Sequence, residues 1–131
     1  MIKLTLPFAT SANHSHHYGS GRKFLSKKTK DFRQQVQDIV VDAKAKIHGT
    51  PRLAIFYAVY PPDKRRRDLG NYEKQTTDAL MAAGVFEDDS QIDFIWMVRK
   101  EVVKGGMIKA VIVENDNIDA IIEHYREVFN G

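Results

Sequence analysis

The chain is most constrained by one apolar stretch at residues 53–60, which reads Leu-Ala-Ile-Phe-Tyr-Ala-Val-Tyr. A strand with one solvated face alternates apolar and polar residues, whereas this stretch is apolar on both faces. It therefore predicts an interior strand of a sheet that is covered on both sides. Pro61 and Pro62 follow directly and end the strand, because proline cannot donate a hydrogen bond to a neighbouring strand.

The elements on either side of this strand predict a mixed sheet with helices on its faces. Strands are expected at residues 2–6, 92–103 and 107–114, and the last two form a hairpin around Lys104-Gly105-Gly106. Helical spacing of apolar residues predicts three helices: from Ser26 as N-cap to Gly49, from Asn71 to Ala83, and over about 117–129. The order β-α-β-α-β-β-α predicts an α/β (α+β) fold. A length of 131 residues fits a single domain, 1–131.

Composition narrows the class of protein. The chain has no cysteine, which excludes disulfides, thiolate metal sites and cysteine nucleophiles. It has no run of about 18 apolar residues and no apolar signal segment at its start, so we expect a cytoplasmic protein without a membrane span. The formal net charge is +3, and the charges are unevenly distributed along the chain. A nucleic-acid partner is compatible with this pattern but not required by it.

A cluster of cations follows the interior strand and runs directly into a carboxylate. Lys64, Arg65, Arg66 and Arg67 precede Asp68, and a second acidic pair, Asp88 and Asp89, follows one short helix later. Consecutive cations seat phosphates, whereas a neighbouring carboxylate repels them unless a divalent cation intervenes. Oxygen ligands suit Mg²⁺, with Mn²⁺ as a possible substitute. If both acidic clusters meet at one site, the residues predict metal-assisted cleavage of a nucleic acid. The alternative is a solvated charged surface.

Three other features have a plain structural interpretation beside a functional one. His14, His16 and His17 occupy a polar loop over residues 8–21, where their spacing favours a solvated or substrate-facing loop over a metal site. Lys74 and Asp78 share one helix face and form either an ordinary surface pair or part of the acidic site. Trp96 could stack a base, but its place in an alternating strand favours packing.

Several blocks of sequence resemble the RusA family of Holliday junction resolvases. They are KRRRDLGNYEK at residues 64–74, DALMAAG at 78–84, DDSQI at 88–92 and KGG at 104–106. The opening of the chain matches the same family in order and approximate spacing, through Leu6-Pro7, Ser11, Asn13, Tyr18, Gly21-Arg22 and Ser26. The resemblance covers residues 1 to about 114 and leaves the C-terminal helix unmatched. That helix either covers the core or extends a dimer interface.

The resemblance implies a homodimeric, Mg²⁺-dependent endonuclease with a small α/β fold, which binds four-way DNA junctions and nicks two strands symmetrically. Such proteins are common in phages and prophages. The family's catalytic residues fall on Asp68, Lys74 and Asp89, and the implied metal ligands are Asp68, Asp88 and Asp89. The implied DNA-binding residues are Lys64, Arg65, Arg66, Arg67, Asn71, Arg22, Lys23 and Asn13.

One position departs from the family motif, because Gly70 stands where the family has a second aspartate. The loss of a carboxylate weakens a site built from few of them. Glu73, Asp88 or Asp93 could supply the missing oxygen. Three explanations follow: a compensated enzyme, an inactive relative that still binds junctions, or an altered sequence. An RNA-binding module is a further alternative, and it predicts a preference for single strands over branched DNA.

Overall fold

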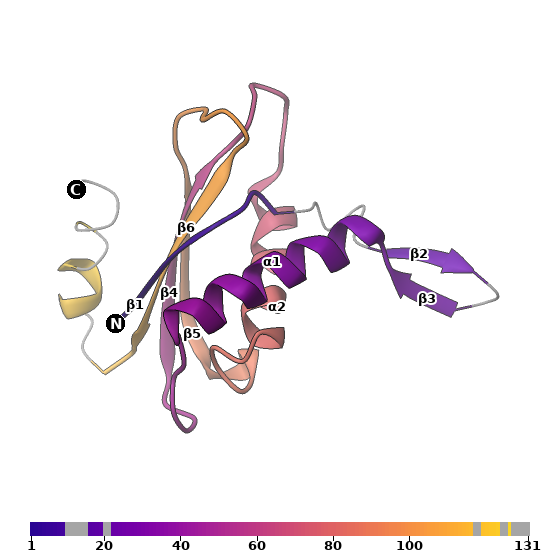
Figure 1. The fold of residues 1–131 in the computed structure, drawn as a ribbon. Coiled ribbons are helices and arrows are strands. Elements are labelled where there is room, and N and C mark those ends of the chain that lie inside the picture. Colours follow the sequence, from indigo (N-terminus) through magenta and orange to yellow (C-terminus); the bar gives the residue numbers. More distant parts are fainter. Residues whose placement is uncertain (10–15, 20–21, 117–118, 124–125, 127–131) are drawn as a thin grey trace.

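The structure is a computed structural model of the 131-residue chain (Figure 1). It describes residues 1–9, 16–19, 22–116, 119–123 and 126, and for 16–19 and 22–24 it describes the backbone only. The elements in chain order are β1 (Ile2–Leu6), β2 (His16–Gly19), β3 (Arg22–Leu25), α1 (Lys27–Ala43), β4 (Leu53–Tyr60), α2 (Leu69–Ala82), the short 3₁₀ helix η2 (Asp89–Gln91), β5 (Ile92–Arg99) and β6 (Met107–Glu114).

The interior strand is β4, as the sequence predicts. All eight of its residues are buried. It pairs in parallel with β5 and antiparallel with β6, and β1 pairs antiparallel with the other side of β6. The sheet order is therefore β1-β6-β4-β5 (Figure 1). The predicted hairpin of the last two strands is wrong, because β4 lies between β5 and β6 and pairs with both. The mixed α/β architecture expected from the sequence is confirmed.

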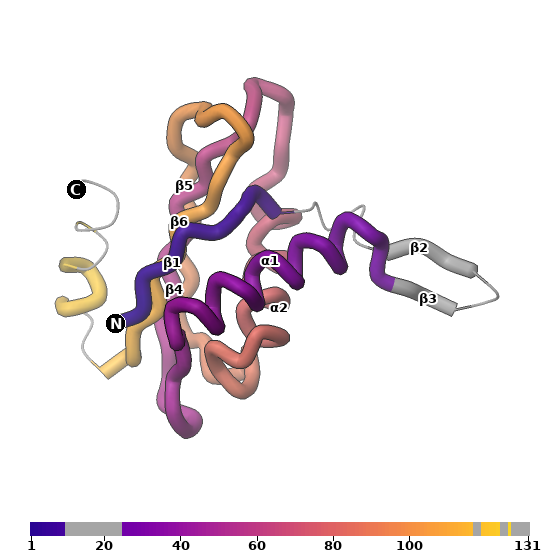
Figure 2. Tube along the Cα trace, in the orientation of Figure 1, coloured from indigo at the N-terminus to yellow at the C-terminus, as the bar shows by residue number. Residues whose placement is uncertain are grey.

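Helices α1 and α2 cover one face of this sheet (Figures 1 and 2). Ser26 caps α1 as predicted, since its hydroxyl oxygen accepts a hydrogen bond from the Thr29 backbone N–H at 3.2 Å. The apolar stripe of α1 packs on the sheet and on α2 in the larger of two core clusters. Large side chains of that cluster include Leu6, Phe32, Val36, Ile55, Tyr57, Leu80 and Ile108.

The opposite face of the sheet carries a smaller apolar cluster. Phe56 and Tyr60 of β4 pack there with Val111 and Val113 of β6 and with Ile121. Residues 119–123 are helical and lie on this side of the sheet, away from α1 and α2 (Figure 1). The described part of the C-terminal helix therefore covers the core. The rest of the predicted helix, apart from residue 126, lies outside the described residues.

The prediction of a polar loop over residues 8–21 is wrong in part. Strands β2 and β3 form an antiparallel hairpin, in which His16 pairs with Leu25 and Gly19 with Arg22. The hairpin extends from the N-terminal end of α1 away from the sheet (Figure 1). Polar residues predicted a loop because a strand is normally identified by its apolar face, but backbone pairing needs no such face.

Helix α1 ends six residues before the predicted Gly49. Lys44 adopts the left-handed conformation with φ 53°, and its N–H bonds to the last turn of the helix. Ile47 continues the apolar spacing and is buried, but it lies beyond the helix and its N–H donates to the Val85 carbonyl at 2.7 Å. A buried apolar residue beyond the end of the helix thus happens to continue the helical spacing.

Strand β5 also ends early, at Arg99 instead of residue 103. The chain beyond it still follows β4, because the Lys100 N–H donates to the Val59 carbonyl at 2.8 Å and the Val103 N–H donates to the Pro61 carbonyl at 2.9 Å. Residues 100–103 therefore run beside Pro61 without continuing as a strand.

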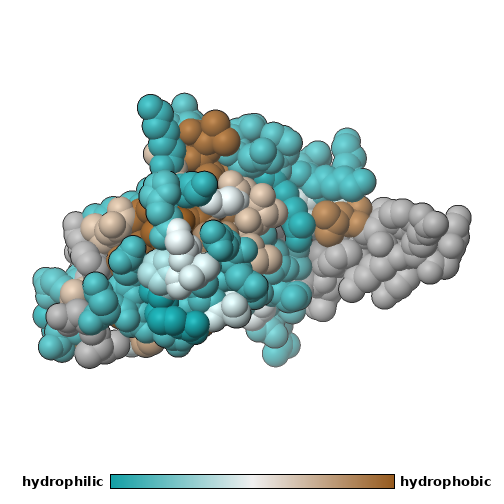
Figure 3. Space-filling model, turned by 90° about the horizontal axis from the view of Figure 1, so that it is seen from below, coloured by the Kyte–Doolittle hydropathy of each residue, from teal (hydrophilic) through white to brown (hydrophobic). Residues whose placement is uncertain are grey.

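The described surface is mainly polar. On the face shown in Figure 3, hydrophilic groups predominate and apolar groups form separate patches. Exposed large apolar side chains include Val41, Trp96 and Ile122. Among the described residues no helix combines the length and apolar character needed to cross a membrane.

The turn between β5 and β6 depends on a glycine. Gly106 has φ +69°, and a Cβ there would lie 2.9 Å from the Phe8 Cβ and 3.0 Å from the Pro62 Cδ. Neighbouring Gly105 has φ +81° with open space around it. Both positions favour glycine for conformational reasons, but only Gly106 also permits close packing against the segments that follow β1 and β4.

Gly106→Ala should therefore destabilise the fold more than Gly105→Ala. We expect Gly105→Ala to lower the free energy of unfolding by about 1–2 kcal/mol through the left-handed conformation alone. Gly106→Ala should lower it by about 1–3 kcal/mol more, because the Cβ displaces Phe8 and Pro62. Urea denaturation of the two variants measures the difference. Equal losses would contradict the packing role of Gly106.

Candidate active site

Asp68 caps the N-terminus of α2. Its Oδ1 accepts a hydrogen bond from the Gly70 backbone N–H at 3.0 Å, and its own backbone is extended. The helix begins at Leu69 and not at Asn71, so Gly70 lies inside its first turn and the cap is the predicted catalytic carboxylate itself. Steric constraints do not require glycine at position 70, since a Cβ there would lie 3.5 Å from Asp68 Oδ1, an ordinary van der Waals contact.

Lys74 lies on the exposed face of α2. Its Nζ is 3.8 Å from Asp78 Oδ2, and 67% of its side chain is exposed. Asn71 lies one turn earlier on the same helix and is half-buried. The i, i+4 pair between Lys74 and Asp78 that the sequence predicts is therefore present, and the long lysine side chain can still reach a ligand.

A cavity of about 320 Å³ brings Lys74 together with Asp89. Its walls come from α2, η2 and β5. The residues that line it are Glu73, Lys74, Thr77, Asp78, Asp89, Ile92 and Ile95. Two of the three predicted catalytic residues thus share one cavity, together with two further carboxylates.

Asp68 does not line that cavity. Because β4 and β5 are parallel, α2 runs back across the sheet between them. Asp68 caps the start of α2 after the end of β4, and Asp89 lies just before β5 begins. Glu73 and Lys74, which share the cavity with Asp89, follow Asp68 by five and six residues, or roughly 8 Å along the helix axis. The cavity therefore begins about one helical turn beyond Asp68.

Glu73 is held in the cavity by a chain of hydrogen bonds from the core. The Thr77 hydroxyl donates to Glu73 Oε1 at 2.8 Å, and the oxygens of Thr77 and Tyr57 are 2.8 Å apart. Because the Thr77 proton is directed to Glu73, the Tyr57 hydroxyl is the donor to Thr77. Burial raises the pKa of the Tyr57 phenol, which keeps that proton in place. The Glu73 carboxylate is thus oriented from a fully buried tyrosine.

Asp88 and Asp93 have local structural partners. Asp88 caps η2 and accepts from the Ser90 backbone N–H at 3.0 Å, a bond that lowers the pKa of the Asp88 carboxyl. Asp93 pairs with the Arg52 guanidinium, which lowers the pKa of Asp93, and it also accepts a hydrogen bond from Asn115 at 3.3 Å. Neither lines the cavity of Lys74 and Asp89.

The cation run lies at the end of β4 and is ordered by Asp63. The Asp63 carboxylate lies 2.7 Å from Arg67 Nη1 and accepts from the Arg65 backbone N–H at 2.9 Å. Together with the Arg65 side chain, these contacts hold the pKa of the Asp63 carboxyl well below its usual range, with Arg67 as the largest contribution. Only 12% of the Arg67 side chain is exposed, so its direction is fixed.

Two further cations join this run, although the sequence analysis did not select them. Arg99 donates from Nη2 to the Arg67 carbonyl at 2.5 Å, and Lys100 follows it. A groove of about 520 Å³ is lined by Pro61, Asp63, Lys64, Arg65, Arg66, Arg67, Arg99, Lys100, Glu101 and Val102, and we call it the basic groove. The sequence did hold a signal for these two residues, since they are cations at the end of a second strand. Parallel strands end on the same side of a sheet, so cations at the ends of two such strands lie close together.

The remaining predicted DNA-binding residues come from the N-terminal part of the chain. Arg22 and Lys23 belong to β3, but their side chains lie outside the described residues, as does all of Asn13. The same holds for His14 and for the side chains of His16 and His17 in β2. Predictions for these residues therefore stay predictions.

A cavity with a lysine and three carboxylates, combined with a groove of cations, has the chemistry of a nuclease that cleaves phosphodiesters. A family model described as endodeoxyribonuclease RusA matches residues 6–113. The crossover junction endodeoxyribonuclease RusA of Escherichia coli (strain K12) is 34% identical over 114 residues, which cover 87% of this chain and 95% of that protein. The counterpart from Enterobacteria phage HK97 is 34% identical over 116 residues, which cover 88% and 97%. The chain belongs to the RusA family, and the resemblance found in its sequence is confirmed.

The position of Asp89 depends on Gln91, and this gives a prediction about stability. Gln91 is buried; its Oε1 accepts from the backbone N–H groups of Glu87 and Asp88, and its Nε2 donates to the Pro51 carbonyl at 3.0 Å. Gln91→Ala leaves these groups without their partner and should lower the free energy of unfolding by about 2–4 kcal/mol. Urea denaturation measures the loss. Glu87→Ala, at an exposed position in the same loop, is the control and should stay within about 0.5 kcal/mol; similar values for both would contradict the role of Gln91.

Proposed function

We propose that this chain is an endodeoxyribonuclease that resolves four-way DNA junctions by paired symmetric nicks, acting as a homodimer with Mg²⁺. The observation that carries the proposal is the shared cavity of Lys74 and Asp89 in a member of the RusA family. The relatives named above are crossover junction endodeoxyribonucleases. A two-fold dimer matches a two-fold junction, so one site on each protomer would nick one strand. Its substrate would place the protein in the cytoplasm.

The donors around the cavity suit Mg²⁺ in kind. This ion takes oxygen ligands, commonly one or two carboxylates completed by water and substrate phosphates. Asp89 and Glu73 provide such carboxylates. Among the described residues no three His, Asp or Glu side chains form a metal-binding group by themselves, so DNA phosphates would complete the coordination. When bound, the ion supplies an activated water and offsets charge on the phosphate.

The protein's own residues have distinct parts in this proposal. Lys74 stabilises the negative charge that develops on the scissile phosphate. Asp88 is a positioning residue, because it caps the 3₁₀ helix that carries Asp89. The basic groove binds the DNA backbone on the side of the sheet where β4 and β5 end. The family role of Asp68 as a metal ligand is tested by Asp68→Asn, because asparagine is an equally good N-cap and removes only the charge.

We further propose that Glu73 replaces the carboxylate that is absent at Gly70. Of the three candidates from the sequence, Asp93 is paired with Arg52 and Asp88 caps η2. Glu73 alone of the three lines the cavity of Lys74 and Asp89, and Thr77 orients it. The first turn of α2 also accepts a side chain at position 70 without a clash.

Cleavage of a synthetic four-way junction in Mg²⁺, with linear duplex as control, tests these assignments. We expect paired nicks that Asp68→Asn and Asp89→Asn abolish. Glu73→Gln should lower the cleavage rate by about 10²-fold or more, since even second-shell changes at metal sites cost about 10–100-fold. In the Gly70→Asp background the same Glu73→Gln change should cost much less. An equal loss in both backgrounds would contradict the replacement of Asp by Glu73.

The absence of a carboxylate at Gly70 also supports a second candidate, a junction-binding protein with impaired cleavage. This candidate predicts tight junction binding in EDTA and no nicking by the wild type in Mg²⁺ or Mn²⁺. Gly70→Asp would then create activity, whereas a compensated enzyme would gain little. Gel shift and cleavage on the same junction separate the two.

The basic groove predicts the salt dependence of binding. Each phosphate contact that is lost should reduce the slope of log K against log [salt] by about 1. Lys100→Ala, in the groove, should weaken junction binding and reduce the slope by about this amount. Lys46→Ala is the matched control, because Lys46 is exposed before β4, at the far end of the sheet. Equal slopes for wild type and Lys100→Ala in a salt titration would remove Lys100 from the interface.

A further inference from the structure

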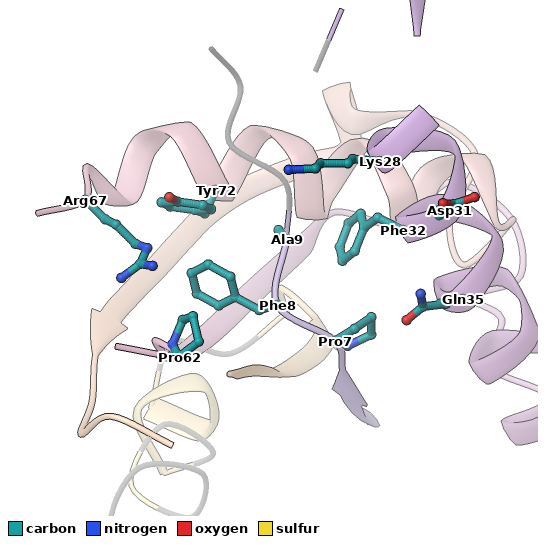
Figure 4. A pocket seen from close by; sticks show the side chains of 10 residues that line it. All are labelled: Pro7, Phe8, Ala9, Lys28, Asp31, Phe32, Gln35, Pro62, Arg67 and Tyr72. Carbon is teal, nitrogen blue, oxygen red and sulfur yellow. The ribbon is translucent and has the colours of Figure 1, made fainter. Parts of the chain in front are cut away.

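A second cavity, of about 430 Å³, lies beside the basic groove (Figure 4). Its walls come from the segment after β1, from the first turns of α1, and from the start of α2. Phe8, Phe32 and Tyr72 supply aromatic walls, and Lys28, Asp31 and Arg67 supply charged groups. We call this cavity the aromatic pocket. Neither the catalytic assignment nor the basic groove accounts for it.

The aromatic side chains form a connected set. The centroids of the Phe8 and Tyr72 rings are 5.0 Å apart with planes tilted by 46°. The Arg67 guanidinium lies over the Phe8 ring, 5.3 Å from its centroid. Figure 4 shows Phe8 between Arg67 and Ala9, with Tyr72 above it. An aromatic ring with a neighbouring guanidinium is a stacking surface for a planar, electron-rich group.

The position of Phe8 is fixed by packing. Its Cβ approaches the backbone of Gly106 so closely that no side chain fits between them, and Pro62 packs on the same glycine. Phe32 and Tyr72 are buried parts of the helices behind the pocket. The pocket is thus already formed in the protein without a ligand. Binding would therefore not lose free energy to the ordering of these side chains.

Arg67 connects the aromatic pocket with the basic groove, because it lines both. Its guanidinium is held by Asp63 on one side and lies over Phe8 on the other. A backbone phosphate in the groove would therefore lie within a nucleotide's reach of the pocket. This continuity indicates a ligand that has both a phosphate and a planar apolar group, which is the chemistry of a nucleotide.

Polar groups at the α1 side of the pocket can read such a ligand. Asp31 and Gln35 are exposed on α1 and line the pocket, with Lys28 one turn earlier. In Figure 4 these side chains surround the end of the pocket opposite Arg67. A carboxylate accepts hydrogen bonds from the amino groups of cytosine, adenine or guanine, whereas thymine has no amino group.

We propose that the aromatic pocket receives one nucleobase that is unstacked from the branch point of the DNA. The inference rests on the proposed function, since a four-way junction offers bases at the crossover whose stacking is interrupted. The base stacks against Phe8 and Tyr72, Arg67 holds the adjoining phosphate, and Asp31 favours bases that carry an amino group.

The test compares a parent four-way junction with junctions that carry one abasic site at each position flanking the crossover. Binding is measured in EDTA. For the position that enters the pocket, we expect the wild type to bind the abasic junction roughly 10-fold more weakly, in line with the stacking contribution of a single base. Phe8→Leu keeps the apolar volume and loses the ring, so it should bind the parent and abasic junctions equally. Phe94→Leu, which alters a half-buried ring on β5, is the matched control and should keep the 10-fold difference.

Asp31→Ala is a second, independent variant. Asp31 is exposed, so the substitution should leave the stability of the fold unchanged. The wild type should disfavour thymine at the sensitive position, and Asp31→Ala should remove that preference while leaving the preference for junctions over duplex intact. If no abasic position affects the wild type although it prefers and cleaves junctions, the pocket does not take a base and the proposed function stands. If the wild type shows no preference for junctions over linear duplex, both proposals are wrong.

Discussion

The structure depends on the burial of β4 from both sides. The strand is hydrogen-bonded to β5 on one edge and β6 on the other, and apolar clusters cover both of its faces. No residue of β4 is available to a ligand, so function has to begin where the strand ends. Pro61 and Pro62 end it, and the four cations follow on a backbone that Asp63 and Arg99 hold in place. The charged segment is therefore held in a fixed position relative to the core strand.

The direction of the strands gathers the other segments at the same end of the sheet. Strands β1, β4 and β5 all end there, and β6 begins there. Phe8, Pro62 and Gly106 therefore meet, and Arg99 reaches the Arg67 carbonyl at the same end, although these residues are far apart in the sequence. The crossover through α2 distributes the acidic residues along the helix. Asp68 lies beside the cations at the start of α2, whereas Glu73 and Lys74, about one turn further along, line a cavity with Asp89. The functional surface consequently has a part that binds the DNA backbone and a part that holds the carboxylates.

Much of this could be predicted from particular residues. The doubly apolar 53–60 strand, the Ser26 cap and the strand over 107–114 are local patterns, and the structure confirms them. The predicted pairing of that strand with β5 as a hairpin is wrong, because β4 lies between the two. The family blocks identified the nuclease family for the same reason, since they are short and contiguous. What could not be predicted depends on contacts that are distant in sequence. Arg99 and Lys100 join the basic groove only because β5 is parallel to β4. The β2–β3 hairpin has no apolar signature, and Ile47 imitates a helical position although α1 ends at Ala43.

Gly70 and Gly106, which belong to two of the family blocks, have opposite structural roles. Gly106 is required, because its φ and the approach of Phe8 and Pro62 exclude any side chain. Gly70 is not required, because it lies in a regular helix with room for a Cβ. The glycine at this position therefore removes a carboxylate without altering the backbone. The hydrogen bonds that begin at buried Tyr57 and reach Glu73 through Thr77 lie one turn further along the same helix. A helix can exchange a carboxylate at one position for another a turn away while its cap and its packing stay unchanged. The fold therefore accommodates Gly70, and the arrangement of carboxylates around Lys74 decides what the absence of the aspartate does to cleavage.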